Sequence, residues 1–301
     1  MAIPALARPR TGRLAPVRPD RLAGLFEPAL RTWAIVVYAF LFLPIVVVVI
    51  FSFNASRLVD VWSGFSLKWY GIAWTDPSIL DALKTSLIVA LVNAVFATVF
   101  GTLAAIGMQR VGRRLRTAFE TLVYGTIVTP EIVIAIASLL FFVTINIDLG
   151  IPTIIITHVV YNTSIVALIV RARLVGMDRT LEEAAADLGA TPIQTLRRVT
   201  IPLLYPAILA GGLLAFTFSF DDFVLTFFVS GATSTTLPLK IFSMLRFGIS
   251  PVVNAVATVM LAVTLTCIFT ASLLVRRHGR GEGEAGLLLS AARSAAQRRA
   301  A

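Results

Sequence analysis

Long apolar segments alternate along the chain with short segments rich in charge. Apolar runs of about 20 residues, or roughly 30 Å as a helix, can cross a membrane. Such runs occur at residues 33–53, 85–108, 118–143, 151–170, 203–229 and 251–275. The third run contains Pro130 and Glu131 at its middle, and a break is expected there because proline removes a backbone hydrogen bond. The pattern predicts an all-α fold, a polytopic membrane bundle of six transmembrane helices.

The segments between these runs predict loops and tails. Residues 54–84 contain three tryptophans and Tyr70 among polar residues, which suits a loop or short helix at the membrane surface. Residues 230–250 are expected to form a loop. Residues 1–32 and 276–301 are rich in arginine and have no apolar periodicity, so they predict a disordered N-terminal tail and a C-terminal tail. The six-span domain is therefore expected to cover residues 33–275.

Composition and charge support a membrane protein and predict its orientation. The chain of 301 residues is 57% hydrophobic and only 14% charged, unlike an average soluble domain. By the positive-inside rule, both termini and the loops of residues 109–117 and 171–198 are expected in the cytoplasm. Of the 26 basic residues, the opposite side would then hold only Arg57, Lys68, Lys84, Lys240 and Arg246. No basic patch is interleaved with aromatic residues, so nucleic-acid binding is not expected.

A charged segment at residues 178–202 carries the signals of two short helices. Thr180 followed by Glu183 predicts a capping box at the start of the first helix, and Gly189 predicts its end. Thr191 followed by Gln194 predicts a second capping box, with proline at the first helical position. One face of the first helix is apolar: Leu181, Ala184, Ala185 and Leu188. A plain connector needs only a few residues, so this helix pair predicts the docking of a partner.

The spacing within this segment resembles the EAA loop of permease subunits of ABC importers. Glu183-Ala184-Ala185 is followed after three residues by Gly189, and after nine more by Val199-Thr200-Ile201-Pro202, where that family has I-x-L-P. The resemblance covers about residues 30–275. It implies that the loop of residues 173–202 is a coupling helix seated in a separate ATP-hydrolysing subunit. The coupling residues that it implies are Glu182, Glu183, Ala184, Ala185, Asp187 and Gly189.

A second resemblance concerns the cargo. The stretches AFTFSFDDFVLTFF and TSTTLPLKIFSMLRFGISPVVNA are similar to the second permease subunit of spermidine/putrescine importers. This resemblance implies import of polyamines or a similar small cation across the bacterial inner membrane. It also implies two ATP-binding subunits, a homologous second permease subunit and an external or periplasmic substrate-binding protein, with lipid around the bundle. Branches that import iron or phosphonates share much of the pattern and remain an alternative.

Ionisable residues within the apolar runs are candidates for the substrate pathway, because burying a charge at the centre of a membrane helix costs about 2.5–3.5 kcal/mol. They are Glu131, His158, Asp221 and Asp222. Asp221 and Asp222 are expected within one continuous helix, where one can face the pathway; the structural alternative is a pair with Lys240 or Arg246. Glu131 could line the pathway or cap the half-helix after the break. His158 is expected to form a hydrogen bond between helices.

The sequence also argues against several kinds of chemistry. It contains no G-x-x-x-x-G-K-[ST] phosphate-binding loop, so ATP hydrolysis is expected on a partner chain. No nucleophile–base pair or set of metal ligands stands out, so no catalytic residue, metal or cofactor is expected. The single cysteine, Cys267, excludes an intramolecular disulfide. The rival hypothesis is an ion-coupled secondary carrier that uses Glu131, Asp221 and Asp222.

Overall fold

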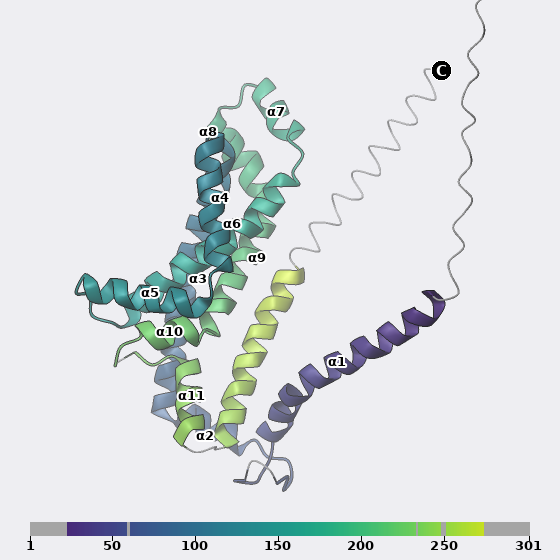
Figure 1. Ribbon diagram of the computed structural model, residues 1–301, viewed down its shortest axis with the longest axis vertical. Helices are drawn as coiled ribbons and strands as arrows, with labels where there is room; N and C mark the ends of the chain where they lie inside the picture. Colours follow the sequence, from purple (N-terminus) through teal and green to yellow (C-terminus); the bar gives the residue numbers. More distant parts are fainter. Residues whose placement is uncertain (1–22, 59–60, 233, 248–250, 274–301) are drawn as a thin grey trace, which may run out of the picture. The chain divides into compact units, whose positions relative to one another are not determined.

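The computed structural model of the chain describes residues 23–273 apart from residues 59–60, 233 and 248–250 (Figure 1). The chain divides into two units, residues 1–48 and residues 49–301. Helix α1, Ala23–Ser52, accounts for the described residues of the first unit. It begins ahead of residue 33, where the first apolar run starts. The predicted tail at residues 276–301 and most of the tail at residues 1–32 lie outside the described residues.

Every regular element among the described residues is a helix, as the apolar runs predict. The helices that are long and apolar enough to cross a membrane are Pro28–Ser52, Pro77–Arg110, Ile151–Val175, Pro192–Phe220 and Pro251–Leu273. The bent pair Arg113–Val128 and Glu131–Thr144 adds a sixth if it crosses as one span. The prediction of an all-helical membrane bundle is confirmed.

Three helices form the core of the second unit: α3 (Pro77–Arg110), α6 (Ile151–Val175) and α9 (Ile201–Phe220). They pack side by side (Figure 1). Small residues permit this close approach, as is common between membrane helices. A methyl group added at Gly101 of α3 would lie 2.6 Å from Cβ of Val166 and 2.9 Å from the backbone nitrogen of Ala167, both on α6.

Helix α3 begins earlier than its apolar run. Asp76 and Pro77 form its start. The Asp76 side chain accepts a hydrogen bond from the backbone N–H of Ser78 (2.8 Å), and Pro77 occupies the first helical position. Both residues suit a helix N-terminus, where backbone N–H groups lack helical partners. Ahead of this start lies the short helix α2 (Lys68–Thr75), which fits the loop or short helix predicted for residues 54–84, whereas residues 77–84 belong to α3.

The third apolar run is divided at Pro130, as predicted. Helices α4 (Arg113–Val128) and α5 (Glu131–Thr144) meet there at a bend of 107°. Helix α4 packs against α6. Glu120 of α4 accepts hydrogen bonds from Arg116 Nε (2.8 Å) and from Arg171 Nη2 of α6 (2.5 Å). Helix α5 turns away and packs against α10 (Val224–Val229).

Two sequence-based expectations about the last third of the chain are wrong. Residues 203–229 do not form one helix, because α9 ends at Phe220 and α10 begins only at Val224. Residues 230–250, expected as a loop, contain helix α11, Leu237–Phe247. Leu237 is buried at its start, and its backbone N–H donates to Ser86 Oγ of α3 (2.7 Å). This hydrogen bond joins residues far apart in the sequence and satisfies a backbone N–H group at the start of α11. Residues 230–236 are mostly polar, which is why the sequence predicted a loop here.

Replacing Gly101 with alanine is expected to destabilise the bundle, because the added methyl group would overlap the backbone of Ala167 as well as the Val166 side chain. Overpacking of this kind costs roughly 1–3 kcal/mol. Gly107→Ala is the matched control on the same helix, since a Cβ there meets no atom within 4 Å. Thermal unfolding of the protein in detergent measures the difference. Equal melting temperatures for the two variants would contradict a tight contact between α3 and α6.

Candidate functional site

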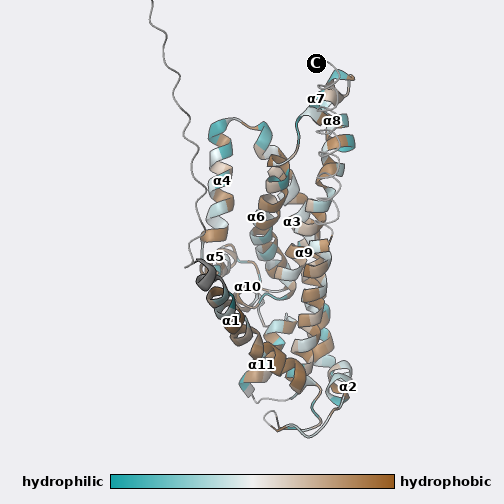
Figure 2. Cartoon of the chain, turned by 90° about the vertical axis from the view of Figure 1, so that its right-hand side faces the viewer, coloured by the Kyte–Doolittle hydropathy of each residue, from teal (hydrophilic) through white to brown (hydrophobic). Residues whose placement is uncertain are grey.

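The charged segment at residues 178–202 folds as a pair of short helices, as predicted. Helix α7 spans Thr180–Asp187, and α8 (Pro192–Thr195) continues through a π-helical turn, Leu196–Thr200, into α9. Both lie at one end of the α3–α6–α9 bundle, beyond its apolar length (Figure 2). The segment is thus held away from the apolar part of the bundle.

One of the two predicted capping boxes forms. Thr191 N donates to Gln194 Oε1 (2.9 Å), and Gln194 N donates to Thr191 Oγ1 (3.3 Å). The box expected at Thr180 and Glu183 is wrong, because Thr180 is already helical and its backbone N–H donates to Asp178 Oδ1 (3.0 Å). Asp178 thus accepts a hydrogen bond ahead of the helix in place of Thr180, and the helix begins at Thr180, one residue earlier than the expected capping box would place its start.

Gly189 ends α7, as predicted. Its φ of +81° is a left-handed conformation that favours glycine. Its N–H donates to Ala186 O (2.9 Å), and the N–H of Ala190 donates to Ala185 O (3.0 Å). These bonds satisfy carbonyl groups that the end of the helix leaves free. The turn that joins α7 to α8 therefore has one defined geometry.

The surface of this helix pair carries large apolar side chains that nothing in the chain covers among the described residues. Leu188 is 89% exposed, Ile193 77% and Leu181 49%. Of the acidic residues implied in coupling, Glu183 and Asp187 are exposed, whereas Glu182 is half-buried and accepts a hydrogen bond from Thr200 Oγ1 (2.6 Å). Glu182 thus ties α7 back to the start of α9.

A second candidate site is a cavity of about 350 Å³ inside the bundle. It brings together all three residues that were predicted for the substrate pathway, Glu131, Asp221 and Asp222. The other residues that line it are His158, Tyr161, Asn162, Phe218, Phe223, Val224 and Leu225. Carboxylates with aromatic rings beside them form an environment that favours cations.

Breaks between helices position the three carboxylates. Glu131 is the first residue of α5, directly after the bend at Pro130. Asp221 follows the last residue of α9, and Asp222 lies between α9 and α10. The expectation that Asp221 and Asp222 occupy one continuous helix is wrong. The sequence shows no proline or glycine at this break, so the apolar pattern alone predicted an unbroken span.

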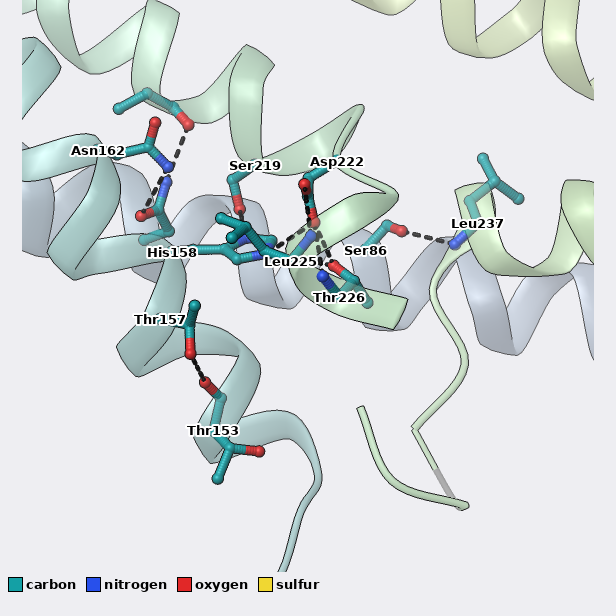
Figure 3. Close-up of polar contacts among 12 residues, drawn as sticks. Ser86, Thr153, Thr157, His158, Asn162, Ser219, Asp222, Leu225, Thr226 and Leu237 are labelled. Carbon is teal, nitrogen blue, oxygen red and sulfur yellow. Dashed lines mark hydrogen bonds and ion pairs between the residues drawn. The ribbon is translucent and has the colours of Figure 1, made fainter. Parts of the chain in front are cut away.

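Asp222 is the centre of a buried hydrogen-bond network (Figure 3). Its Oδ2 accepts from the backbone N–H of Thr226 (2.8 Å) and from Thr226 Oγ1 (2.7 Å), and it lies 3.1 Å from His158 Nε2. Its Oδ1 accepts from the N–H of Leu225 (3.2 Å). The other ring nitrogen of His158 lies 2.7 Å from Ser219 Oγ. The prediction that His158 forms a hydrogen bond between helices is confirmed. Among the described residues, the ion-pair partner of Asp222 is His158, not Lys240 or Arg246.

Apart from His158, the polar residues that support this network were not predicted from the sequence. His158, Tyr161 and Asn162 share one face of α6 at spacings of three and four residues, which is a signal that an apolar helix has a polar stripe. Asn162 Nδ2 donates to Asn93 Oδ1 of α3 (3.3 Å), and Asn93 Nδ2 donates to Ala215 O of α9 (2.9 Å). These bonds link the three core helices next to the cavity.

Comparison with known proteins reveals relatives over most of the chain. Residues 97–281 match the family described as "Binding-protein-dependent transport system inner membrane component". The spermidine/putrescine transport system permease protein PotC of Shigella flexneri is 38% identical over 82% of this chain and 94% of its own length. The putrescine transport system permease protein PotI of Escherichia coli K12 is 40% identical over 83% of this chain and 93% of its own length.

Solved structures share the fold at low sequence identity. A chain of a bacterial ABC transporter involved in the import of the acidic polysaccharide alginate has a TM-score of 0.64 at 16% identity, and the match covers 86% of this chain and 99% of that chain. A chain of the MetNI methionine ABC transporter has a TM-score of 0.59 at 19% identity, covering 69% of this chain and 98% of its own. These two matches show a shared fold. The family model and the PotC and PotI relatives show that the chain belongs to the family of inner-membrane components of binding-protein-dependent transport systems.

Proposed function

We propose that this chain is the permease subunit of an ABC importer that moves polyamines, such as spermidine and putrescine, or a similar small cation into the cell. The cavity in which Glu131, Asp221 and Asp222 meet carries this proposal. Burying a carboxylate in a largely apolar bundle costs free energy unless a positive charge lies close to it. A flexible alkylammonium ion supplies that charge together with methylene groups that suit the rings of Phe218 and Phe223. The names of the PotC and PotI relatives agree with this cargo.

Energy is proposed to come from two ATP-binding subunits that dock on the helix pair at residues 178–202. Its exposed leucine and isoleucine side chains support this role, because a protein partner can bury them. The proposed coupling residues are those that line α7 and its end: Glu182, Glu183, Ala184, Ala185, Asp187 and Gly189. Docking there requires that the helix pair, and with it both termini, lie in the cytoplasm. The loop of residues 173–202 then transmits closure of the ATP-binding subunits to α6 and α9, which flank it.

The remaining partners follow from the same proposal. A homologous second permease subunit completes the bundle, and lipid surrounds it. An external or periplasmic binding protein delivers the cargo to the opposite side of the membrane, as the family description implies. The proposed membrane domain spans residues 33–275, and the flanking segments, residues 1–32 and 276–301, are proposed to lie in the cytoplasm.

The transport function is tested with vesicles that contain the complete importer and its binding protein. Uptake of labelled putrescine and spermidine is expected only when ATP is present on the side of the ATP-binding subunits. An imposed proton or sodium gradient without ATP is expected to drive no uptake. Accumulation driven by the gradient alone would instead support an ion-coupled carrier, and uptake of iron or phosphonate in place of polyamine would overturn the cargo.

Docking of the ATP-binding subunits is tested with the double variant Leu188→Ser, Ile193→Ser. It is expected to lose most of the ATP-binding subunit that copurifies with the permease, because each buried apolar side chain contributes about 1.5–3 kcal/mol to an interface. Leu115→Ser is the matched control, since Leu115 is 52% exposed on α4 and lies outside the helix pair. Equal recovery of the ATP-binding subunit with both variants would count against docking at this surface.

A further inference from the structure

We infer that the two neighbouring aspartates have different tasks: Asp221 contacts the cationic cargo, and Asp222 is a positioning residue that holds open the break between α9 and α10. This inference rests on the proposed function and goes beyond it, because the proposal places both carboxylates in the cavity without dividing their roles. It follows from their hydrogen bonds, their exposure and the cavities that they line.

The hydrogen-bonding capacity of Asp222 is largely used within the chain. Oδ2 has three partners, the backbone N–H and the hydroxyl of Thr226 and the ring of His158, while Oδ1 accepts from Leu225 N. A carboxylate has about four lone-pair sites for acceptance. The side chain is also buried, with 9% of the residue exposed. A cargo ammonium group could bind Asp222 only by displacing these partners.

The same bonds explain how Asp222 shapes the backbone. Its carboxylate accepts the free N–H groups of Leu225 and Thr226 in the first turn of α10, in the manner of a helix cap. Helix α10 has only six residues, too short to be stable without such support. His158 on α6 then fixes the cap to the core. Asp222 therefore keeps the chain from continuing α9 as one straight helix.

Asp221 differs from Asp222 in its exposure and in its hydrogen bonds. Its residue is exposed, and no hydrogen bond or ion pair of its carboxylate occurs among the described residues. It follows the C-terminal end of α9, where the carbonyl groups carry partial negative charge. A carboxylate and a helix C-terminus at the same point repel each other unless a cation lies between or beside them. Broken membrane helices use such ends to coordinate cations.

Asp221 also lies where two cavities meet. It lines the polar cavity that contains Glu131 and Tyr161, and a second cavity of about 380 Å³. That second cavity is mainly apolar: its other lining residues are Phe223, Pro238, Ile241, Phe242, Leu245, Ala257, Met260 and Leu261. Phe223 belongs to both cavities, and its ring centre is 4.8 Å from that of Phe242. An ammonium group at Asp221 can thus have its methylene chain on this aromatic pair.

The two roles predict different effects of conservative substitutions at residues 221 and 222. At residue 221 the charge is needed, so Asp221→Asn is expected to lower ATP-driven polyamine uptake about tenfold or more, and Asp221→Glu to recover most of that loss. At residue 222 the hydrogen bonds are needed, and asparagine keeps one acceptor oxygen, which can still cap the helix by accepting from the N–H and hydroxyl groups of Thr226. Asp222→Asn is therefore expected to retain uptake within about tenfold of the wild type, whereas Asp222→Ala lowers both the uptake and the melting temperature.

Initial uptake rates in vesicles with the complete importer, together with melting temperatures of the purified complex, test this division. Undiminished uptake by Asp221→Asn would overturn the contact role. Loss of uptake by Asp222→Asn at an unchanged melting temperature would overturn the positioning role, because a charge rather than a cap would then be needed. No polyamine uptake by the wild type would overturn the proposed function and this inference with it, so the two failures are distinguishable.

Chemical protection provides a direct test of contact. In a Cys267→Ser background, which removes the single native cysteine, the thiol of Asp221→Cys is expected to react with a water-soluble methanethiosulfonate reagent. Millimolar spermidine is expected to slow this reaction, whereas it leaves unchanged the reaction of the control Leu115→Cys, because Leu115 is 52% exposed on α4 and lines neither the cavity nor the helix pair. Equal rates with and without spermidine at residue 221 would contradict contact with the cargo.

Discussion

The break between α9 and α10, capped by Asp222 and fixed by His158, is the constraint on which the cavity depends. Backbone groups freed inside a membrane must find partners within the protein, because lipid offers none. Here the Asp222 carboxylate takes up two N–H groups of α10, and His158 joins that carboxylate to α6. A polar break is thereby stabilised in the apolar bundle, and at this break the Asp221 carboxylate has no hydrogen-bond partner among the described residues.

A second break between helices lies beside the same cavity. Pro130 divides the third apolar run, and α5 leaves the direction of α4 at 107° to pack against α10. The two short helices that follow the breaks therefore support each other. Glu131 begins α5, where the free N–H groups of the helix favour a negative charge. Carboxylates at two separate breaks between helices thus line one cavity.

The bundle connects this cavity to the helix pair at its end. Helices α6 and α9 both lead from the cavity to residues 178–202, and Glu182 joins α7 to Thr200 at the start of α9. The close contacts at Gly101 and the Asn93–Asn162 bond make α3, α6 and α9 one packed body. The packed helices therefore form a direct structural connection between the helix pair and the cavity.

The sequence alone determined the helical membrane fold, the break at Pro130, the end of α7 at Gly189 and the second capping box, because each depends on local chemistry or on a long apolar run. It also identified Glu131, Asp221, Asp222 and His158, since a charge within an apolar run is visible without coordinates. Only the tertiary structure decided that α9 ends at Phe220, that α11 forms, and that His158 rather than a lysine or arginine accompanies Asp222. Those features depend on partners more than 60 residues away in the chain, and no local pattern records such contacts.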